Sequence, residues 1–107
     1  MRLFRAISAA EKESYSENNI FYCTDRTLTV KQFFKSLSDT RNFVEKAVAQ
    51  SFSPPYSTIV EIELSKNSLN DMIFEELTLD TWPAISFPEL NLQKLNENRK
   101  FITYHEC

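Results

Sequence analysis

The chain has 107 residues, of which 42% are hydrophobic and 25% charged, and its formal net charge is −3. This length and composition predict one globular domain, residues 1–107, with enough apolar side chains for a core, and they exclude a disordered chain. The negative charge argues against general nucleic-acid binding, which requires a basic surface, but it is compatible with a basic protein partner.

The sequence contains no glycine. Glycine-rich loops that hold phosphate groups are therefore excluded, and with them P-loop and Rossmann dinucleotide sites. Positions with positive φ must be taken by asparagine or aspartate, which tolerate this conformation best after glycine, or be avoided.

Cysteine and histidine are too few and too far apart for a metal site. The chain has Cys23, Cys107 and one histidine, His105, which lies in a terminal segment that we expect to fray. No stretch approaches 18 consecutive apolar residues, so no membrane span is expected. Without a secretory signal, we expect a cytoplasmic protein, or one that a specialised secretion route delivers.

The first quarter of the chain predicts strand, helix and strand. Residues 3–7 form a short apolar run typical of a strand. Ser8 and Glu11 then have the spacing of a capping box, in which each residue satisfies a backbone N–H at the start of a helix over residues 9–17. Residues 20–24 are a second candidate strand.

The middle of the chain contains the clearest helix. Residues 30–36 are predicted to be a strand that leads into a helix over residues 39–50, capped by Ser36 or Ser38. One apolar stripe at helical spacing is expected to face the core and consists of Phe43, Val44, Ala47 and Val48.

Residues 56–64 alternate in the manner of a strand with one buried face, and we expect this to be the central strand. The buried side is predicted to hold Thr58, Val60, Ile62 and Leu64. The opposite, solvated side is predicted to hold Ile59, Glu61 and Glu63.

The last third predicts short elements only. A single helical turn is expected at residues 68–71, strands at 72–79, 82–87 and 100–105, and a helix over 88–96. Pro83 indicates an edge position for its strand, and Pro88 suits the first turn of the helix. In the last strand, Phe101 and Thr103 should share one face. Together the elements predict an α+β fold, a mixed, mostly antiparallel sheet with two or three packed helices.

Three sets of polar residues are candidates for chemistry. Arg5 interrupts an apolar strand, so it is either solvent-facing or a bidentate contact for phosphate or carboxylate. Ser36 and Ser38 are helix caps or pocket residues. Glu61 and Glu63 share one strand face, which is either solvated or an acid–base pair with one raised pKa.

Four segments in order resemble small bacterial ADP-ribosyltransferase-like domains of polymorphic toxins. The first is residues 3–8 followed by Glu11, which resembles the family's arginine-bearing strand and acidic helix. The others are residues 31–39 followed by Phe43, residues 57–69, and residues 87–91 with Leu95 and Asn96.

This resemblance implies a transferase that uses NAD as its substrate and modifies a protein target, as a toxin or effector. Arg5 would contact the dinucleotide, and Ser36 and Ser38 would order the nicotinamide pocket. The catalytic carboxylate would be Glu63 or Glu61, although the family places it on a later strand, and residues 82–87 contain none. The alternative is a non-enzymatic interaction protein, an immunity or regulatory module that binds a cognate protein partner.

Overall fold

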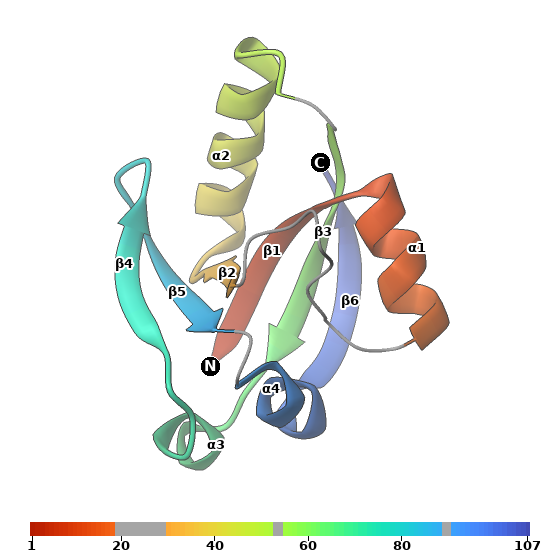
Figure 1. Cartoon of the computed structure of the whole chain (residues 1–107). Helices are drawn as coiled ribbons and strands as arrows, with labels where there is room; N and C mark the ends of the chain where they lie inside the picture. The colour runs from red at the N-terminus through yellow and green to blue at the C-terminus, as the bar shows by residue number, and fades with distance from the viewer. Residues whose placement is uncertain (19–29, 53–54, 89–90) are drawn as a thin grey trace.

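The computed structural model describes residues 1–18, 30–52, 55–88 and 91–107, which build one six-stranded antiparallel sheet with four helices (Figure 1). The strands are β1 (Arg2–Ser8), β2 (Val30–Phe34), β3 (Tyr56–Glu63), β4 (Glu75–Leu79), β5 (Trp82–Pro88) and β6 (Lys100–Glu106). The helices are α1 (Ala9–Asn18), α2 (Leu37–Ala49), α3 (Lys66–Asn70) and α4 (Leu92–Asn98). The predicted α+β class and single domain are confirmed.

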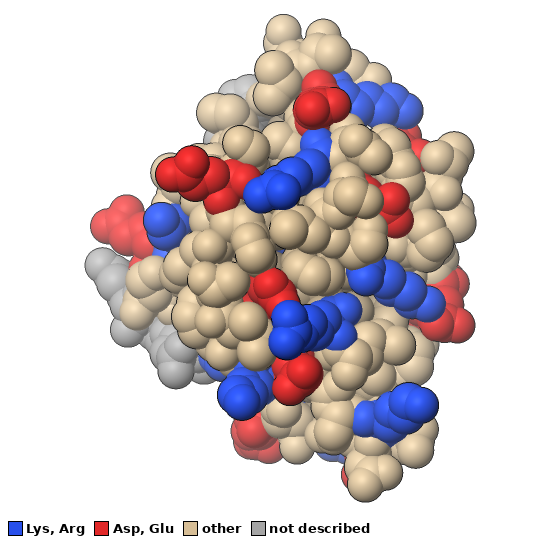
Figure 2. Space-filling model, turned by 180° about the vertical axis from the view of Figure 1, so that it is seen from behind, with Lys and Arg blue, Asp and Glu red and all other residues tan. Residues whose placement is uncertain are grey.

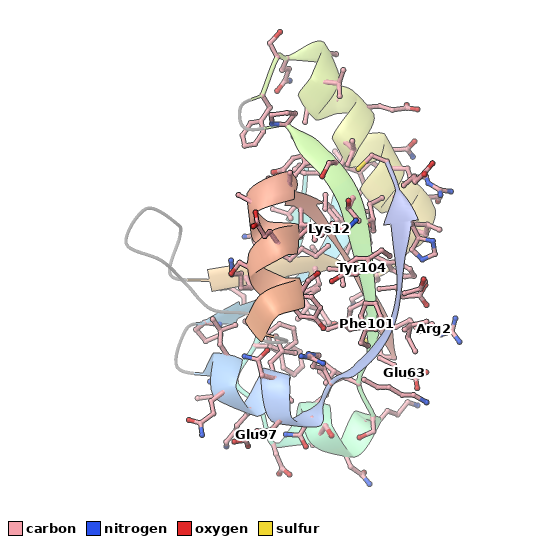
Figure 3. All side chains as sticks on the ribbon, turned by 90° about the vertical axis from the view of Figure 1, so that its right-hand side faces the viewer. Arg2, Lys12, Glu63, Glu97, Phe101 and Tyr104 are labelled. Carbon is pink, nitrogen blue, oxygen red and sulfur yellow. The ribbon has the colours of Figure 1, made fainter. Side chains whose placement is uncertain are left out.

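The sheet order is β4-β5-β2-β1-β3-β6, and helices cover both faces. Cross-strand partners share a face, so Leu3 lies beside Ile62 on the side that contacts α1 and α4. Phe4 and Phe34 point to the other side, where Phe34 contacts Phe43 of α2. Figure 3 shows α1 and α2 on opposite sides of β3 and β6. None of the helices within the described residues is long and apolar enough to cross a membrane.

The core lies between the sheet and the layer of α1 and α4. Its fully buried side chains include Leu3, Ile7, Phe33, Val60, Ile62, Ile85, Phe87 and Leu95. They come from four strands and one helix, and β3 contributes Val60 and Ile62 from the face that its alternation predicts to be buried.

β3 differs from its predicted place and environment. It is the second strand from the edge, and β1 and β2 occupy the centre. Both of its faces are buried, because Ile59 on the side predicted to be solvated is 0% exposed and Glu61 is 4% exposed. The prediction of a solvated face was wrong because Arg2 and His105 cover Glu61, and α2 lies on this side of the sheet (Figure 3).

α2 begins at Leu37, directly after Ser36 and before the predicted start at residue 39. The Ser36 Oγ accepts a hydrogen bond from the Asp39 backbone N–H at 3.0 Å, which confirms Ser36 as the N-cap. The buried residues are Thr40, Val44 and Ala47, at positions i, i+4 and i+7. Val48, predicted to be inward, is 67% exposed because the buried stripe runs through Thr40 instead.

The prediction that Pro83 places its strand at the edge of the sheet was wrong. β5 lies between β4 and β2. Pro83 pairs with Thr78 of β4, whereas the pairing of β5 with β2 begins only at Ala84. Proline has no backbone N–H, and at position 83 none is needed because β2 does not extend far enough to pair there. Pro88 ends β5 instead of starting a helix, and α4 begins at Leu92, with Leu92 and Leu95 buried.

A bulge changes the faces of β6. The register with β3 shifts between Glu61 and Ile62, so Phe101 and Tyr104 both contact the Tyr15 ring of α1. The prediction that Phe101 shares a face with Thr103 was wrong, because an inserted residue inverts the alternation. The predicted strand at residues 20–24, with Cys23, lies outside the described residues.

Positive φ is found at three described residues, Ser51, Asp80 and Thr81. Only Asp80 is of the type expected in a glycine-free chain. Asp80 and Thr81 are the two residues between paired Leu79 and Trp82, so they form the whole turn of the β4–β5 hairpin. Two-residue hairpin turns of this kind need positive φ at both positions, even in threonine.

Replacing Thr81 by glycine is expected to stabilise the protein by about 1 kcal/mol, because glycine reaches φ of 81° without the clash that a branched Cβ creates. Chemical denaturation of Thr81→Gly measures this gain. The control, Thr78→Gly in β4, should lose stability instead, since the same change within a strand only adds backbone entropy to the unfolded chain. If Thr81→Gly is less stable than the wild type, the claim that threonine is strained at this positive φ is wrong.

Candidate functional site

The Arg5 side chain lies where β1 and β2 separate. These strands pair at Phe4 and Phe34. Arg5 Nη1 donates a hydrogen bond to the carbonyl oxygen of Gln32 at 3.0 Å. The guanidinium thus satisfies a β2 backbone acceptor at the point where β1 and β2 diverge.

Glu11 of α1 binds the rest of the guanidinium. Arg5 Nε lies 2.8 Å from Glu11 Oε2, and Arg5 Nη2 lies 3.1 Å from Oε1, which makes a bidentate pair. Lys31 Nζ is 3.8 Å from the same carboxylate, and the Phe33 ring centroid is 6.0 Å from Arg5 Cζ. The Arg5 and Glu11 side chains are 19% and 23% exposed. Arg5 is therefore paired with an anion of its own chain.

The predicted capping box is half present. The Glu11 backbone N–H donates to Ser8 Oγ at 3.3 Å, as expected. The Glu11 carboxylate binds Arg5, and this side chain is not the reciprocal cap of Ser8. A cap residue visible in the sequence is thus also the counter-ion of the arginine that interrupts β1.

A small cavity of about 60 Å³ adjoins Arg5. Its other lining residues are Ala6, Gln32, Phe34, Phe43, Tyr56 and Leu79. Burial raises the pKa of the Tyr56 hydroxyl, Arg5 lowers it and Glu11 raises it further, with a net increase. Tyr56 is accordingly neutral at pH 7.

The pKa of Glu11 is below its usual value of 4.5. Burial alone would raise this pKa, but the hydrogen bonds and positive charge of Arg5, aided by Lys31, outweigh burial. A carboxylate whose folded pKa is lowered stabilises the fold above its unfolded pKa, and this contribution disappears as the pH falls through the folded pKa.

We therefore expect the stability difference between the wild type and Glu11→Gln to be largest at neutral pH and to shrink below about pH 4. Urea denaturation at several pH values measures it. Glu13→Gln, an exposed change on the same helix, is the control and should show no such dependence. A difference that stays constant down to pH 3 would contradict the ion pair.

A second polar cluster lies on the opposite face of the sheet, around Glu61. Its Oε2 is 3.1 Å from Arg2 Nη1, and its Oε1 is 2.7 Å from His105 Nε2. Glu63 Oε2 lies 3.8 Å from Arg2 Nε, and the two labelled side chains lie on the outer side of the sheet in Figure 3. Acidic and basic side chains are interspersed on this side of the molecule, with no single-sign patch (Figure 2).

The role of His105 was missed from the sequence. It was expected in a fraying end, but β6 pairs with β3 as far as Glu106, and His105 lies opposite Ile59. The imidazole is 23% exposed. Only the pairing of β6 with β3 brings this single histidine to a buried carboxylate that lies 44 residues earlier.

The candidate residues therefore lie in three places. Arg5 contacts Glu11 on the α1 side, Ser36 caps α2, and Ser38 is exposed in the first turn of that helix. Glu61 and Glu63 contact Arg2 on the other face.

The fold and these clusters define a small α+β protein whose buried charges are paired within the chain. No protein-family model, curated protein or solved structure matches it.

Proposed function

We propose that this chain is an interaction protein that binds a protein partner through an apolar surface at the end of α2. The surface, here the α2 patch, consists of Val48, Phe52, Pro55 and Tyr56. Val48 is 67% exposed and Phe52 50% exposed. Large apolar side chains that gather on a surface are typical of interaction sites.

The two aromatic rings of the α2 patch are already ordered. Phe52 and Tyr56 stack with centroids 5.2 Å apart and an interplanar angle of 14°, and Tyr56 also contacts Phe43. A ring held in place loses less side-chain entropy on binding, so more of the burial energy stabilises the complex. This exposed, stacked Phe52 is the observation that carries the proposal.

An open groove of about 220 Å³ runs beside these rings. It is lined by Ala47, Val48, Ser51, Phe52, Pro55 and Tyr56. The volume is below the roughly 300–1,000 Å³ of small-molecule sites, so it fits an apolar side chain of a partner better than a cofactor. We infer a partner that inserts such a side chain here, where aromatic residues typically supply most binding energy.

The test begins with immobilised wild-type protein, which captures candidate partners from the source cell. Each candidate is then purified and titrated by calorimetry. Phe52→Ser should weaken binding at least about tenfold, because a desolvated aromatic anchor is lost. Ile73→Ser is the matched control, since Ile73 is 69% exposed on a different surface. Equal affinity of the two variants would overturn the proposal.

The second proposal is the NAD-dependent ADP-ribosyltransferase that the sequence resemblance implies. What favours it is that Arg5 and Tyr56 line a common cavity. At about 60 Å³ this cavity must widen to accept a dinucleotide, and Arg5 must exchange Glu11 for the pyrophosphate.

Titration with NAD beside a nicotinamide-release assay tests this second activity. If Arg5 holds the dinucleotide, Arg5→Ala should weaken binding about tenfold to a hundredfold, the effect of a lost bidentate contact. Glu63→Gln and Glu61→Gln test the catalytic carboxylate. No binding at millimolar NAD by the folded protein would overturn it and leave the interaction protein.

A further inference from the structure

The sheet ends in two outer strands, β4 and β6, at opposite sides of the molecule (Figure 1). Within the described residues each has a strand neighbour on one side only. The outer edge of such a strand presents backbone N–H and C=O groups that can pair with another chain.

β6 is poorly suited to such pairing. Its register with β3 shifts between Glu61 and Ile62, and a bulge bends and twists the strand that contains it. The Thr103 hydroxyl also donates to the carbonyl oxygen of Tyr104 at 3.3 Å. Bulges are among the features that protect an edge from further strands.

β4 has a regular edge. It pairs with β5 residue by residue from Glu75, opposite Ser86, to Leu79, opposite Trp82, without a shift. Glu75, Glu76 and Thr78 are exposed, and Leu77 and Leu79 are partly exposed. An added strand could therefore follow the whole of β4 in one continuous ladder, the arrangement found when a peptide extends a sheet.

The charge of this edge selects among partners. Glu75 and Glu76 begin β4, and Asp80 follows it in the hairpin turn. Glu76 pairs with Lys35 at 2.7 Å, and Asp80 pairs with Lys46 at 3.1 Å, but Glu75 has no ion pair among the described residues. A second copy of the chain would bring two acidic edges together, whereas a strand with lysine or arginine would complement them.

We propose that the outer edge of β4 binds an extended, basic segment of another protein as a seventh strand of the sheet. Backbone hydrogen bonds supply the affinity, and basic side chains beside Glu75 and Glu76 supply the selection. This surface is separate from the α2 patch, so the two proposals are tested independently.

The probe is a short peptide of alternating lysine and valine, titrated against the whole protein. Binding should slow the hydrogen exchange of amides in Glu75–Leu79. A peptide of alternating glutamate and valine should not bind. A lysine–valine peptide with N-methylated backbone amides keeps the charge but cannot form a ladder, and its binding should be lost.

Glu75→Lys should weaken binding of the lysine–valine peptide about tenfold, because it replaces attraction by repulsion. Glu13→Lys makes the same change in net charge at an exposed position of α1, and it should have little effect on binding. The proposal is overturned if the N-methylated peptide binds equally, if the two variants lose affinity equally, or if protection appears on β6. Absence of binding, or sedimentation showing a dimer that protects β4, would overturn it too.

Discussion

Arg5→Ala is expected to lower the free energy of unfolding by about 3 kcal/mol, since it leaves the Glu11 carboxylate with Lys31 as its only nearby cation among the described residues and removes the donor to the Gln32 carbonyl. The pair is mostly buried, with side-chain exposures of 19% and 23%, so solvent screens it little. Chemical denaturation measures the loss. Arg41→Ala removes an exposed arginine of α2 and should change stability by less than about 0.5 kcal/mol.

A double-mutant cycle with Glu11→Gln separates the pair from the two single effects. If Arg5 and Glu11 stabilise each other, the double variant should lose clearly less than the sum of the single losses. Arg5→Lys should recover only part of the stability, because an ammonium group cannot form the same bidentate fork. A loss below about 1 kcal/mol for Arg5→Ala would instead indicate an arginine available to a ligand.

Phe87→Ala should cost about 3–5 kcal/mol, the range for deleting a large buried side chain and leaving a cavity. Phe87 is 0% exposed, packs edge-on against Phe33 at 5.8 Å and contacts Phe74 at 6.1 Å. Thermal and urea unfolding measure this loss.

Phe43→Ala is the control, because Phe43 lies on the opposite side of the sheet from the core that contains Phe87. Phe43 lies between Phe34 and Tyr56 on the α2 side and is only partly buried, so its removal should cost roughly 2 kcal/mol. Equal losses at the two positions would contradict a main core on the α1 and α4 side of the sheet.

The sequence by itself determined most of the segments that form strands and helices among the described residues, because these depend on local patterns. Alternation located β3, and the strand predicted at residues 100–105 corresponds to β6. The hydroxyl of Ser36 and the spacing of Val44 and Ala47 located α2 and its start. The sequence also identified Arg5 as unusual, because a charge within an apolar strand requires a partner.

Only the tertiary structure decided which elements lie side by side. The position of Pro83 in an interior strand depends on where β2 ends, and the face of Phe101 depends on a bulge opposite β3. Neither is encoded in local periodicity, which reports that a residue has a buried side but not what covers it.

The polar clusters follow the same division. Glu11 was visible as a cap, and Arg5 as a charge that is either solvent-facing or paired, but their pairing required α1 to follow β1 at a particular angle. The contact of His105 with Glu61 required β6 to close beside β3. Such contacts join residues distant in sequence, and they form only when the packing of the whole sheet offsets the entropy of bringing them together.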